Sequence, residues 1–232
     1  MLYRIASVLV SLGLAQFTLA QTISPPVVPV EKAAYHVPVF QNELVTVLNV
    51  FIPPNRASGY HRHSTDAVGI LLADAERTGQ PLGDKLTVAL RRPRGSVSFS
   101  YYSKQETVHN VATIGSTPFH NIVIALMYAQ PGRFTAGSRA EVSGYTQILD
   151  NPRVRGWRLV LEPGQSVPAI TQSAPGIRVV IDGGEIIESV PGQPERGMAP
   201  KYGEFYWQEA GVTRAVRNNG MSRIEIVEFE FK

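Results

Sequence analysis

The feature that most constrains the fold is an internal repeat, in which two halves of the chain share one order of short apolar runs and turns. When Pro54 is placed on Pro163, the following positions align without a gap as far as Leu72 and Ile181. Residues 109–115 likewise align with residues 214–220. Self-similarity of this kind indicates repeated structural units, so we expect two domains with one strand plan.

The pattern between the turns predicts an all-β chain. After residue 43, short runs rich in β-branched and apolar residues alternate with stretches rich in Gly, Pro and polar residues. No long stretch has the period of an amphipathic helix. Frequent short strands are typical of sandwiches and barrels. We expect strands at residues 44–52, 59–72, 86–90, 96–102, 108–112, 121–127, 157–161, 176–181, 184–189, 204–207, 213–216 and 223–231.

The first twenty residues predict a secretory signal peptide. Arg4 precedes an apolar run from Ile5 to Leu14, and Thr18-Leu19-Ala20 offers a small-x-small cleavage site before Gln21. The run is too short to span a bilayer, although an uncleaved anchor or a buried N-terminal helix is an alternative. We therefore expect residues 1–20 to be removed and the protein to be periplasmic or secreted.

Composition excludes several classes of protein. The chain has no cysteine, so it forms no disulfide and carries no cysteine-linked lipid. Only Arg4 among the 22 basic residues lies in the signal segment, which leaves 21 basic against 19 acidic residues and a net charge of +2. The basic residues are scattered rather than clustered. We expect no nucleic-acid partner, and no membrane association once the signal is removed.

The distribution of proline and glycine divides the mature chain. Residues 21–41 hold several prolines in an extended segment, which we interpret as an N-terminal arm able to give an edge strand. A polar stretch with glycines at residues 129–144 is the best boundary between the two repeats. We place the first domain at residues 42–136 and the second at residues 137–232.

Two histidines in the first repeat suggest a metal site. His61 and His63 are two positions apart, so on a strand their imidazoles face the same side. His109 supplies a third imidazole from a later strand. Neutral imidazole binds iron, manganese, nickel, copper and zinc, and the sequence does not choose among them. A hydrogen-bonded polar cluster or a surface hairpin is the alternative interpretation.

The second repeat lacks these histidines. In the alignment His61 falls on Ile170, His63 on Gln172 and His109 on Arg214. The second half therefore resembles a copy of the first that has lost its metal.

The order of these residues resembles the two motifs of the cupin superfamily, in particular its secreted two-cupin (bicupin) members. The first motif is a glycine, a spacer, His-x-His, three or four residues, Glu and a glycine. The second motif ends in His-x-x-x-Asn with a following glycine. The corresponding residues here are Pro54, Gly59, His61, His63, Gly69, His109, Thr113 and Gly115.

The resemblance covers residues 42 to 232 in two copies and implies two tandem jelly-roll barrels, the second degenerate. It implies one divalent metal ion, Fe, Mn, Ni, Cu or Zn, in the first barrel. By analogy it implies an oxygenase-type enzyme acting on a small organic molecule, with isomerase or lyase chemistry also open. A non-catalytic module that binds a small ligand, or uses the metal structurally, is the alternative. The resemblance also implies a homodimer that pairs through edge strands, with the arm at residues 21–41 as a candidate for exchange between subunits.

The chain departs from the cupin pattern at two places. Ala67 stands where the acidic ligand would be in phase with the histidines, and Thr113 replaces the usual asparagine. The nearby acid, Asp66, would face the opposite side of an ideal strand and would need a bulge to reach a metal. Three roles stay open for Asp66: a ligand, an acceptor that orients a histidine through its second ring nitrogen, or a solvated turn residue.

Other side chains near the histidines are candidates for the pocket. Tyr60 and Tyr102 could line it, although aromatic residues in small barrels are more often core. Glu106 could act as a general base at the mouth of the site, or be solvated. Arg62 alternates with the histidines and should face the other side of the strand, where packing or ion pairing is the usual role.

Arg214 is the candidate in the second barrel. An arginine facing inward could bind a carboxylate or phosphate, because its planar fork suits such groups. The alternative is a structural ion pair with Glu209 or another acid. His36 is interpreted as an ordinary surface or packing residue, and His120 as a strand-end residue rather than a fourth ligand.

Overall fold

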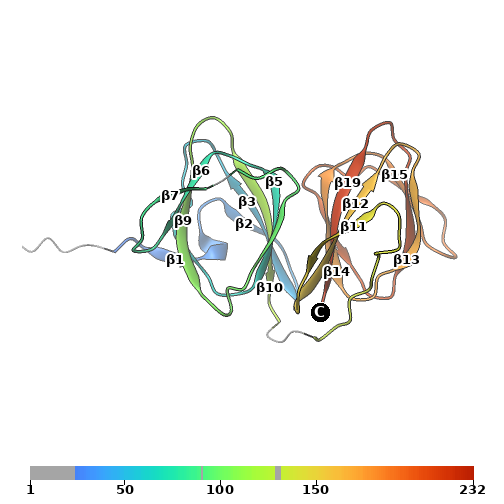
Figure 1. Cartoon of the computed structure of the whole chain (residues 1–232), viewed down its shortest axis with the longest axis horizontal. Helices are drawn as coiled ribbons and strands as arrows, with labels where there is room; N and C mark the ends of the chain where they lie inside the picture. Colours follow the sequence, from blue (N-terminus) through green and yellow to red (C-terminus); the bar gives the residue numbers. More distant parts are fainter. Residues whose placement is uncertain (1–23, 90, 129–131) are drawn as a thin grey trace, which may run out of the picture.

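The computed structural model describes residues 24–89, 91–128 and 132–232, and within them the chain folds into two β-barrels that lie side by side (Figure 1). The fold is all-β, as the repeat and its strand pattern predict. No helix among these residues has the length and apolar character needed to cross a membrane. The expected signal segment, residues 1–20, lies outside the described residues.

Two five-stranded sheets form the first barrel. One sheet, in the order β1-β4-β9-β6-β7, lies on the outer side of the molecule and is called the outer sheet. The other, in the order β2-β3-β10-β5-β8, faces the second barrel and is called the contact sheet. Their strands are β1 (Val27–Pro29), β2 (His36–Gln41), β3 (Val45–Ile52), β4 (Tyr60–His63), β5 (Ala67–Ala73), β6 (Arg77–Pro81), β7 (Thr87–Ala89), β8 (Val97–Ser100), β9 (Thr107–Thr113) and β10 (Phe119–Leu126).

The second barrel repeats this plan strand for strand. Its sheets run β11-β12-β19-β14-β17 and β13-β18-β15-β16, the same order as in the first barrel without an equivalent of β1. The bounds are β11 (Tyr145–Asp150), β12 (Val154–Leu161), β13 (Ser166–Thr171), β14 (Gly176–Asp182), β15 (Ile186–Ser189), β16 (Arg196–Met198), β17 (Phe205–Gln208), β18 (Thr213–Asn218) and β19 (Ile224–Phe231). His61 pairs with His109 across β4 and β9, and Ile170 pairs with Arg214 across β13 and β18, in agreement with the sequence alignment of the repeats.

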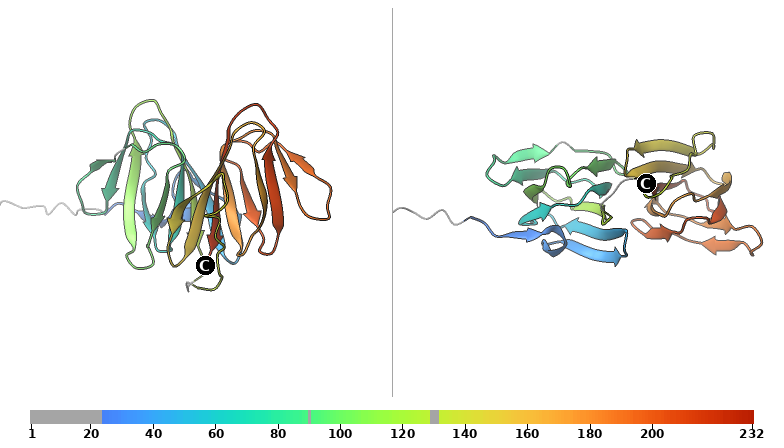
Figure 2. Two further views of the ribbon diagram at one scale, coloured as in Figure 1. Left: turned by 45° about the vertical axis from the view of Figure 1, so that its right-hand side comes forward. Right: turned by 90° about the horizontal axis from the view of Figure 1, so that it is seen from below.

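The two barrels share one hydrophobic core, because the contact sheet packs on the sheet that contains β19 (Figure 2). Alternate residues of β3, β5 and β10 point out of the first barrel, among them Val47, Ile70 and Ile124, and all are fully buried. They meet Ile177 and Phe229 of the second barrel. Both faces of the contact sheet are therefore covered, and each such buried side chain contributes about 1.5–3 kcal/mol.

The N-terminal segment is built into the first barrel. Residues 21–41, expected as an extended arm, include β1, which runs parallel to β4, and β2, which pairs antiparallel with β3. A single turn of 3-10 helix, η1 (Val30–Lys32), connects them. Pro38 lies next to a register shift on the edge strand β2, where its missing N–H leaves no central ladder bond unmade.

Several strands of the structure were not predicted from the sequence. Residues 76–85 contain β6 and residues 191–200 contain β16, although no strand was expected at either place. β11 and β13 were not expected either. These strands are largely polar or half-exposed, so they lack the apolar runs by which the others were recognised. The expected strand at residues 59–72 is two strands, β4 and β5, in different sheets.

Asp66 ties the barrels together at the turn between β4 and β5. Its Oδ2 accepts a hydrogen bond of 2.9 Å from Nη1 of Arg153, and both side chains are buried. Its Oδ1 accepts from the backbone N–H and the hydroxyl of Ser103, at 2.9 and 2.6 Å. Arg153 also donates to the carbonyl of Tyr128, and its guanidinium lies 4.6 Å from the centre of the Tyr128 ring. The pair is an internal brace between the two domains.

Replacement of Arg153 by alanine is expected to lower the free energy of unfolding by about 3–5 kcal/mol, because Asp66 would remain buried without its partner. Arg133→Ala, which removes an exposed partner of Glu43, should change it by less than about 0.5 kcal/mol. Urea denaturation of both variants measures the difference. The double variant Arg153→Ala/Asp66→Ala should lose less than the sum of the single losses; strict additivity would show that the pair is not coupled.

Candidate metal centre

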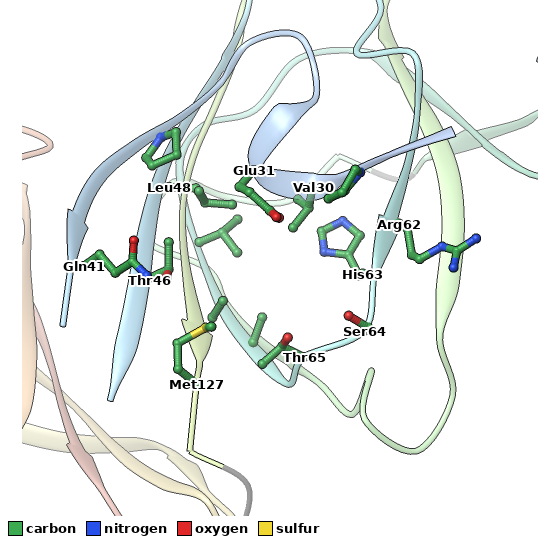
Figure 3. Close-up of a pocket in the computed structure, with 15 residues that line it drawn as sticks. Val30, Glu31, Gln41, Thr46, Leu48, Arg62, His63, Ser64, Thr65 and Met127 are labelled. Carbon is green, nitrogen blue, oxygen red and sulfur yellow. The ribbon is translucent and has the colours of Figure 1, made fainter. Parts of the chain in front are cut away.

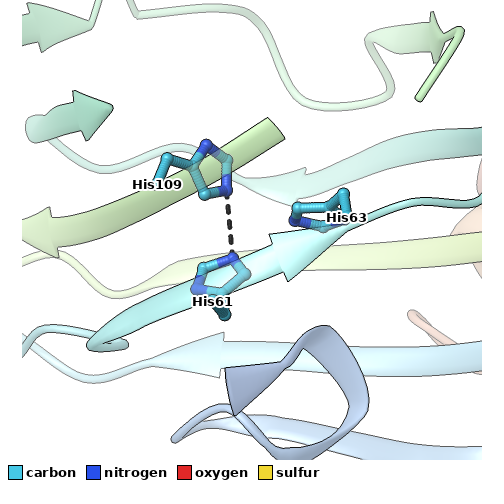
Figure 4. A group of neighbouring side chains, drawn as sticks. All are labelled: His61, His63 and His109. Carbon is cyan, nitrogen blue, oxygen red and sulfur yellow. Dashed lines mark hydrogen bonds between the residues drawn. The ribbon is translucent and has the colours of Figure 1, made fainter. Parts of the chain in front are cut away.

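Three histidines converge inside the first barrel because of the pairing of β4 with β9. His61 lies directly opposite His109 in the antiparallel register, and His63 follows on the same face of β4 (Figure 4). His61 and His63 are buried, with 1% and 7% of their surface exposed, and His109 is half-buried. One ligand atom from each lies within 4.8 Å of the others, and the three residues form a group that could hold a metal ion.

The hydrogen bonds of His61 fix which nitrogen faces its neighbours. Its Nδ1 lies 3.0 Å from the carbonyl oxygen of Gly59, which can only accept, so Nδ1 carries the proton and Nε2 is bare. Gly59 has φ of +71°, a conformation that glycine adopts without strain, and this turn presents its carbonyl to the ring. The same contact orients the imidazole in the way that outer hydrogen bonds orient metal ligands.

The residues present fit a metal ion. Nε2 of His61 lies 3.0 Å from Nε2 of His109. Two nitrogens at about 2.1 Å from one ion, on adjacent positions of an octahedron, lie about 3.0 Å apart. The ring centroids of His63 are 5.0 Å from those of both His61 and His109, so the third imidazole borders the same space.

Burial keeps these imidazoles in the neutral form that binds metals. Loss of hydration lowers the pKa of His63 to about 3 and that of His109 to about 4, and repulsion from the neighbouring histidines adds to both shifts. Burial also lowers the pKa of His61, against a smaller opposing effect of the Gly59 carbonyl. At neutral pH the three side chains are uncharged.

His36 is a fourth histidine of the site, and the sequence interpretation of it as an ordinary packing residue missed this. Its ring centroid lies 4.6 Å from that of His61, and it is 8% exposed. Its Nδ1 donates to the carbonyl of Ala34 over 2.9 Å, and burial lowers its pKa to about 4. The pairing of β2 with β3 places His36 beside Val50, a residue of the barrel interior. The sequence alone does not reveal this pairing, so it could not assign His36 to the site.

The histidines line a small chamber that lies next to a larger pocket. The chamber has a volume of about 130 Å³, and the ring of Tyr102 stacks on that of His63 there, with centroids 4.5 Å apart. His63, Ala67 and Val123 also border the outer pocket of about 520 Å³ (Figure 3). These three residues therefore form the boundary between the two cavities.

Asp66 plays none of the three roles considered for it. It is buried rather than solvated, and its carboxylate is taken up by Ser103 and Arg153. Within the part of the chain that the structure describes, it makes no hydrogen bond to a histidine. The phase argument against Asp66 as a ligand agrees with this placement, whereas its partner Arg153 is too distant in sequence to have been anticipated.

Two other candidates lie outside the pocket. Glu106 pairs with Arg62 over 3.4 Å on the exposed face of β4, so it does not reach the mouth of the site. Tyr60 lies on that same outward face by the alternation of the strand and lines neither cavity. Thr113, where the cupin pattern has asparagine, donates its hydroxyl proton to the carbonyl of Pro53 over 2.5 Å and holds the turn before β4.

The interior of the second barrel carries ion pairs at the equivalent place. Arg214 lies with its Nε 3.9 Å from Glu188, rather than beside Glu209. Gln172 accepts a hydrogen bond of 2.9 Å from Arg139, which also pairs with the buried carboxylates of Glu228 and Glu230. The alignment thus located the positions correctly, and the alternative of a structural ion pair at Arg214 matches this geometry.

Comparisons with known proteins identify the fold. No protein-family model matches the chain, and no curated protein matches it in sequence. A mutant form of the oxalate decarboxylase OxdC of Bacillus subtilis is similar at a TM-score of 0.58 and 10% identity, over 84% of this chain and 71% of that one. The salicylate 1,2-dioxygenase of Pseudaminobacter salicylatoxidans is similar at 0.55 and 13%, over 81% and 71%.

A cupin 2 conserved barrel domain protein from Leptotrichia buccalis is similar at a TM-score of 0.53 and 9% identity, over 85% of this chain and 88% of that one. These likenesses extend over both barrels. They show that the chain has a cupin fold in two tandem copies, as the motifs around the histidines imply.

The metal-free protein is expected to lose stability as the pH falls from about 6.5 toward 4. In this window the histidines of the unfolded chain take up protons while the buried ones stay neutral, so each contributes a slope of about 1 kcal/mol per pH unit. Urea denaturation at pH 7 and pH 5, in the presence of a chelator, measures it. His63→Gln should reduce the slope by about 1 kcal/mol per pH unit, which is the contribution of one proton. An unchanged slope would contradict the low pKa of His63 in the folded protein.

Proposed function

We propose that the first barrel holds one divalent metal ion on His61, His63 and His109 and uses it in an enzymatic reaction on a small organic molecule. The observation that carries the proposal is the approach of two ring nitrogens to 3.0 Å in a buried chamber, one of them shown by its hydrogen bonding to be bare. Without a metal, one nitrogen of such a pair must carry a proton. Iron, manganese, nickel, copper and zinc all suit the donor set.

When bound, such a metal supplies a Lewis acid and, in the case of iron or copper, a redox centre. The residues of the chain do the rest of the work. The Gly59 carbonyl keeps the proton of His61 on Nδ1, and the Tyr102 ring limits rotation of His63. The narrow chamber strips water from the part of the substrate that enters it, which strengthens polar interactions there.

An oxygenase-type reaction is the first choice for the chemistry. Proteins of this fold include a salicylate 1,2-dioxygenase and an oxalate decarboxylase, and these names support a metal-assisted reaction on a small organic molecule without fixing it here. Isomerase or lyase chemistry is the second choice. The absence of Asp66 from the site favours a centre made of imidazoles alone.

A non-catalytic module is the competing proposal, in which the metal or the barrel holds a ligand or serves stability. The interior of the second barrel favours it, since Gln172 and Arg214 stand where the first barrel has ligands, and we infer that this barrel is degenerate and structural. Two results together would support this proposal over the enzyme. Removal of the metal would lower the melting temperature, and the protein would turn over none of a broad panel of aromatic and sugar-acid substrates.

The place of action proposed for the protein is the periplasm or the cell exterior. The support is the N-terminal pattern of Arg4, an apolar run and a small-x-small site. A homodimer is proposed with it, on the basis of the resemblance alone. Mass spectrometry of protein expressed with its N-terminus intact, which detects cleavage after Ala20, tests the location.

Elemental analysis of the purified protein is expected to find about one transition-metal ion per chain. His61→Ala or His109→Ala should lower the affinity by more than about a hundredfold, beyond the loss typical of an outer hydrogen-bond partner. His120→Ala is the matched control, because His120 bonds to Asn49 over 2.8 Å and lines neither cavity. A metal-free wild-type protein, whose stability a chelator does not change, would refute the metal site and the enzyme together.

A further inference from the structure

The outer pocket has an uneven set of charges. Of the residues that line its volume of about 520 Å³, Glu31 and Arg62 are the charged ones, since His63 is neutral. The remaining lining is apolar or carries hydroxyl and amide groups, such as those of Ser64, Thr65 and Gln41. The directions of the two charged side chains therefore decide what the pocket attracts.

Glu31 points inward. It lies on η1, the turn that crosses the barrel mouth between β1 and β2, and its carboxylate extends into the pocket on the side of His63 (Figure 3). Among the residues that the structure describes, no lysine, arginine or histidine forms an ion pair with it. Its negative charge therefore faces whatever molecule enters.

Arg62 points away. Its side chain leaves the pocket on the far side of β4 (Figure 3), because β4 alternates and its other face carries His61 and His63. The guanidinium pairs with Glu106 over 3.4 Å, and both side chains are about half-exposed to solvent. The positive charge beside the pocket is thus already matched and hydrated outside it.

We propose that the outer pocket selects a small, largely apolar molecule that is neutral or cationic, and that Glu31 is the specificity-determining residue which disfavours carboxylates. This inference rests on the proposed function, since it concerns the substrate of the same site. The end of the substrate nearest the histidines offers a donor to the metal. The end that stays in the outer pocket carries a hydroxyl, amide or amine that donates to Glu31, or an apolar group.

The pocket is consequently a poor place for the carboxylate of a benzoate-like molecule. A carboxylate there would meet the solvent-exposed Glu31 without a basic side chain in the pocket to offset the repulsion. A hydrogen-bond donor or a cation in the same position would instead interact favourably with the carboxylate of Glu31. Two ligands of the same shape and opposite charge should therefore differ in affinity, and the difference should depend on Glu31.

The test uses three probes of nearly equal shape: benzoate, benzamide and benzamidine, which are anionic, neutral and cationic. Each is titrated by calorimetry into the full chain loaded with Zn(II), as wild type and as Glu31→Gln. Direct binding of benzoate to the metal is common to both proteins, so it cancels when the ratio of the benzoate Kd to the benzamidine Kd is compared between them. Glu76→Gln is the control, because it removes the same charge from an exposed residue that lines neither cavity.

We expect Glu31→Gln to lower this ratio by about tenfold, as the loss of one nearby charge predicts, with benzamide binding changed by less than about threefold. Glu76→Gln should leave the ratio as in wild type. A ratio that Glu31→Gln changes by less than about twofold would overturn the proposal, as would a wild type that binds none of the probes at about 10 mM, the weak limit for fragments.

The failure of the metal site has a separate signature. If the chain takes up neither Zn(II) nor iron, manganese, nickel or copper, the proposed function fails, and the same titrations on the metal-free chain still measure the dependence of the ratio on Glu31. If Zn(II) binds and the ratio does not depend on Glu31, only the inference about the substrate fails.

Discussion

The antiparallel pairing of β4 with β9 is the constraint on which the candidate site depends. It sets His61 opposite His109, and the alternation of β4 adds His63 to the same face. A slip of one residue would turn His61 and His63 outward and bring Tyr60 and Arg62 into the barrel. The register is held from both sides, because β1 pairs with β4 and β6 pairs with β9. The outer sheet as a whole thus positions two of the three nitrogen donors within 3.0 Å.

The same frame carries opposite chemistry in the second barrel. Where the first barrel has neutral imidazoles around an open chamber, the second has buried guanidinium and carboxylate groups that neutralise one another, such as Arg139 with Glu228. Buried ion pairs contribute little net stability, but removal of one partner is costly, so this interior tolerates few single changes. Its β19 is buried along its whole length, with Phe229 and Phe231 turned toward the first barrel. The second barrel therefore packs against the contact sheet through a fully buried strand.

The sequence predicted those parts of the site that depend on local strand alternation or on the internal repeat, and missed those that depend on contacts between distant segments. Strand alternation is local, so His61 and His63 could be assigned to one face, and the repeat supplied His109 and the equivalence with Arg214. His36 could not be found this way, because its place depends on the pairing of β2 with β3, which no sequence periodicity specifies. The role of Asp66 was not predicted for a related reason, because its partner Arg153 belongs to the other barrel.

The use of Asp66 as a brace has a consequence for the electrostatics of the metal centre. A divalent ion bound by three neutral imidazoles keeps its full charge of about +2, whereas a carboxylate ligand would halve it. The donor group of a substrate, or a carboxylate further away, would offset part of this charge. Glu31 is the carboxylate that lines the outer pocket on the side of His63, and it lies on the 3-10 turn η1. The acidic group nearest the pocket thus lies in the segment before the histidines, on η1, rather than on the strand that follows them.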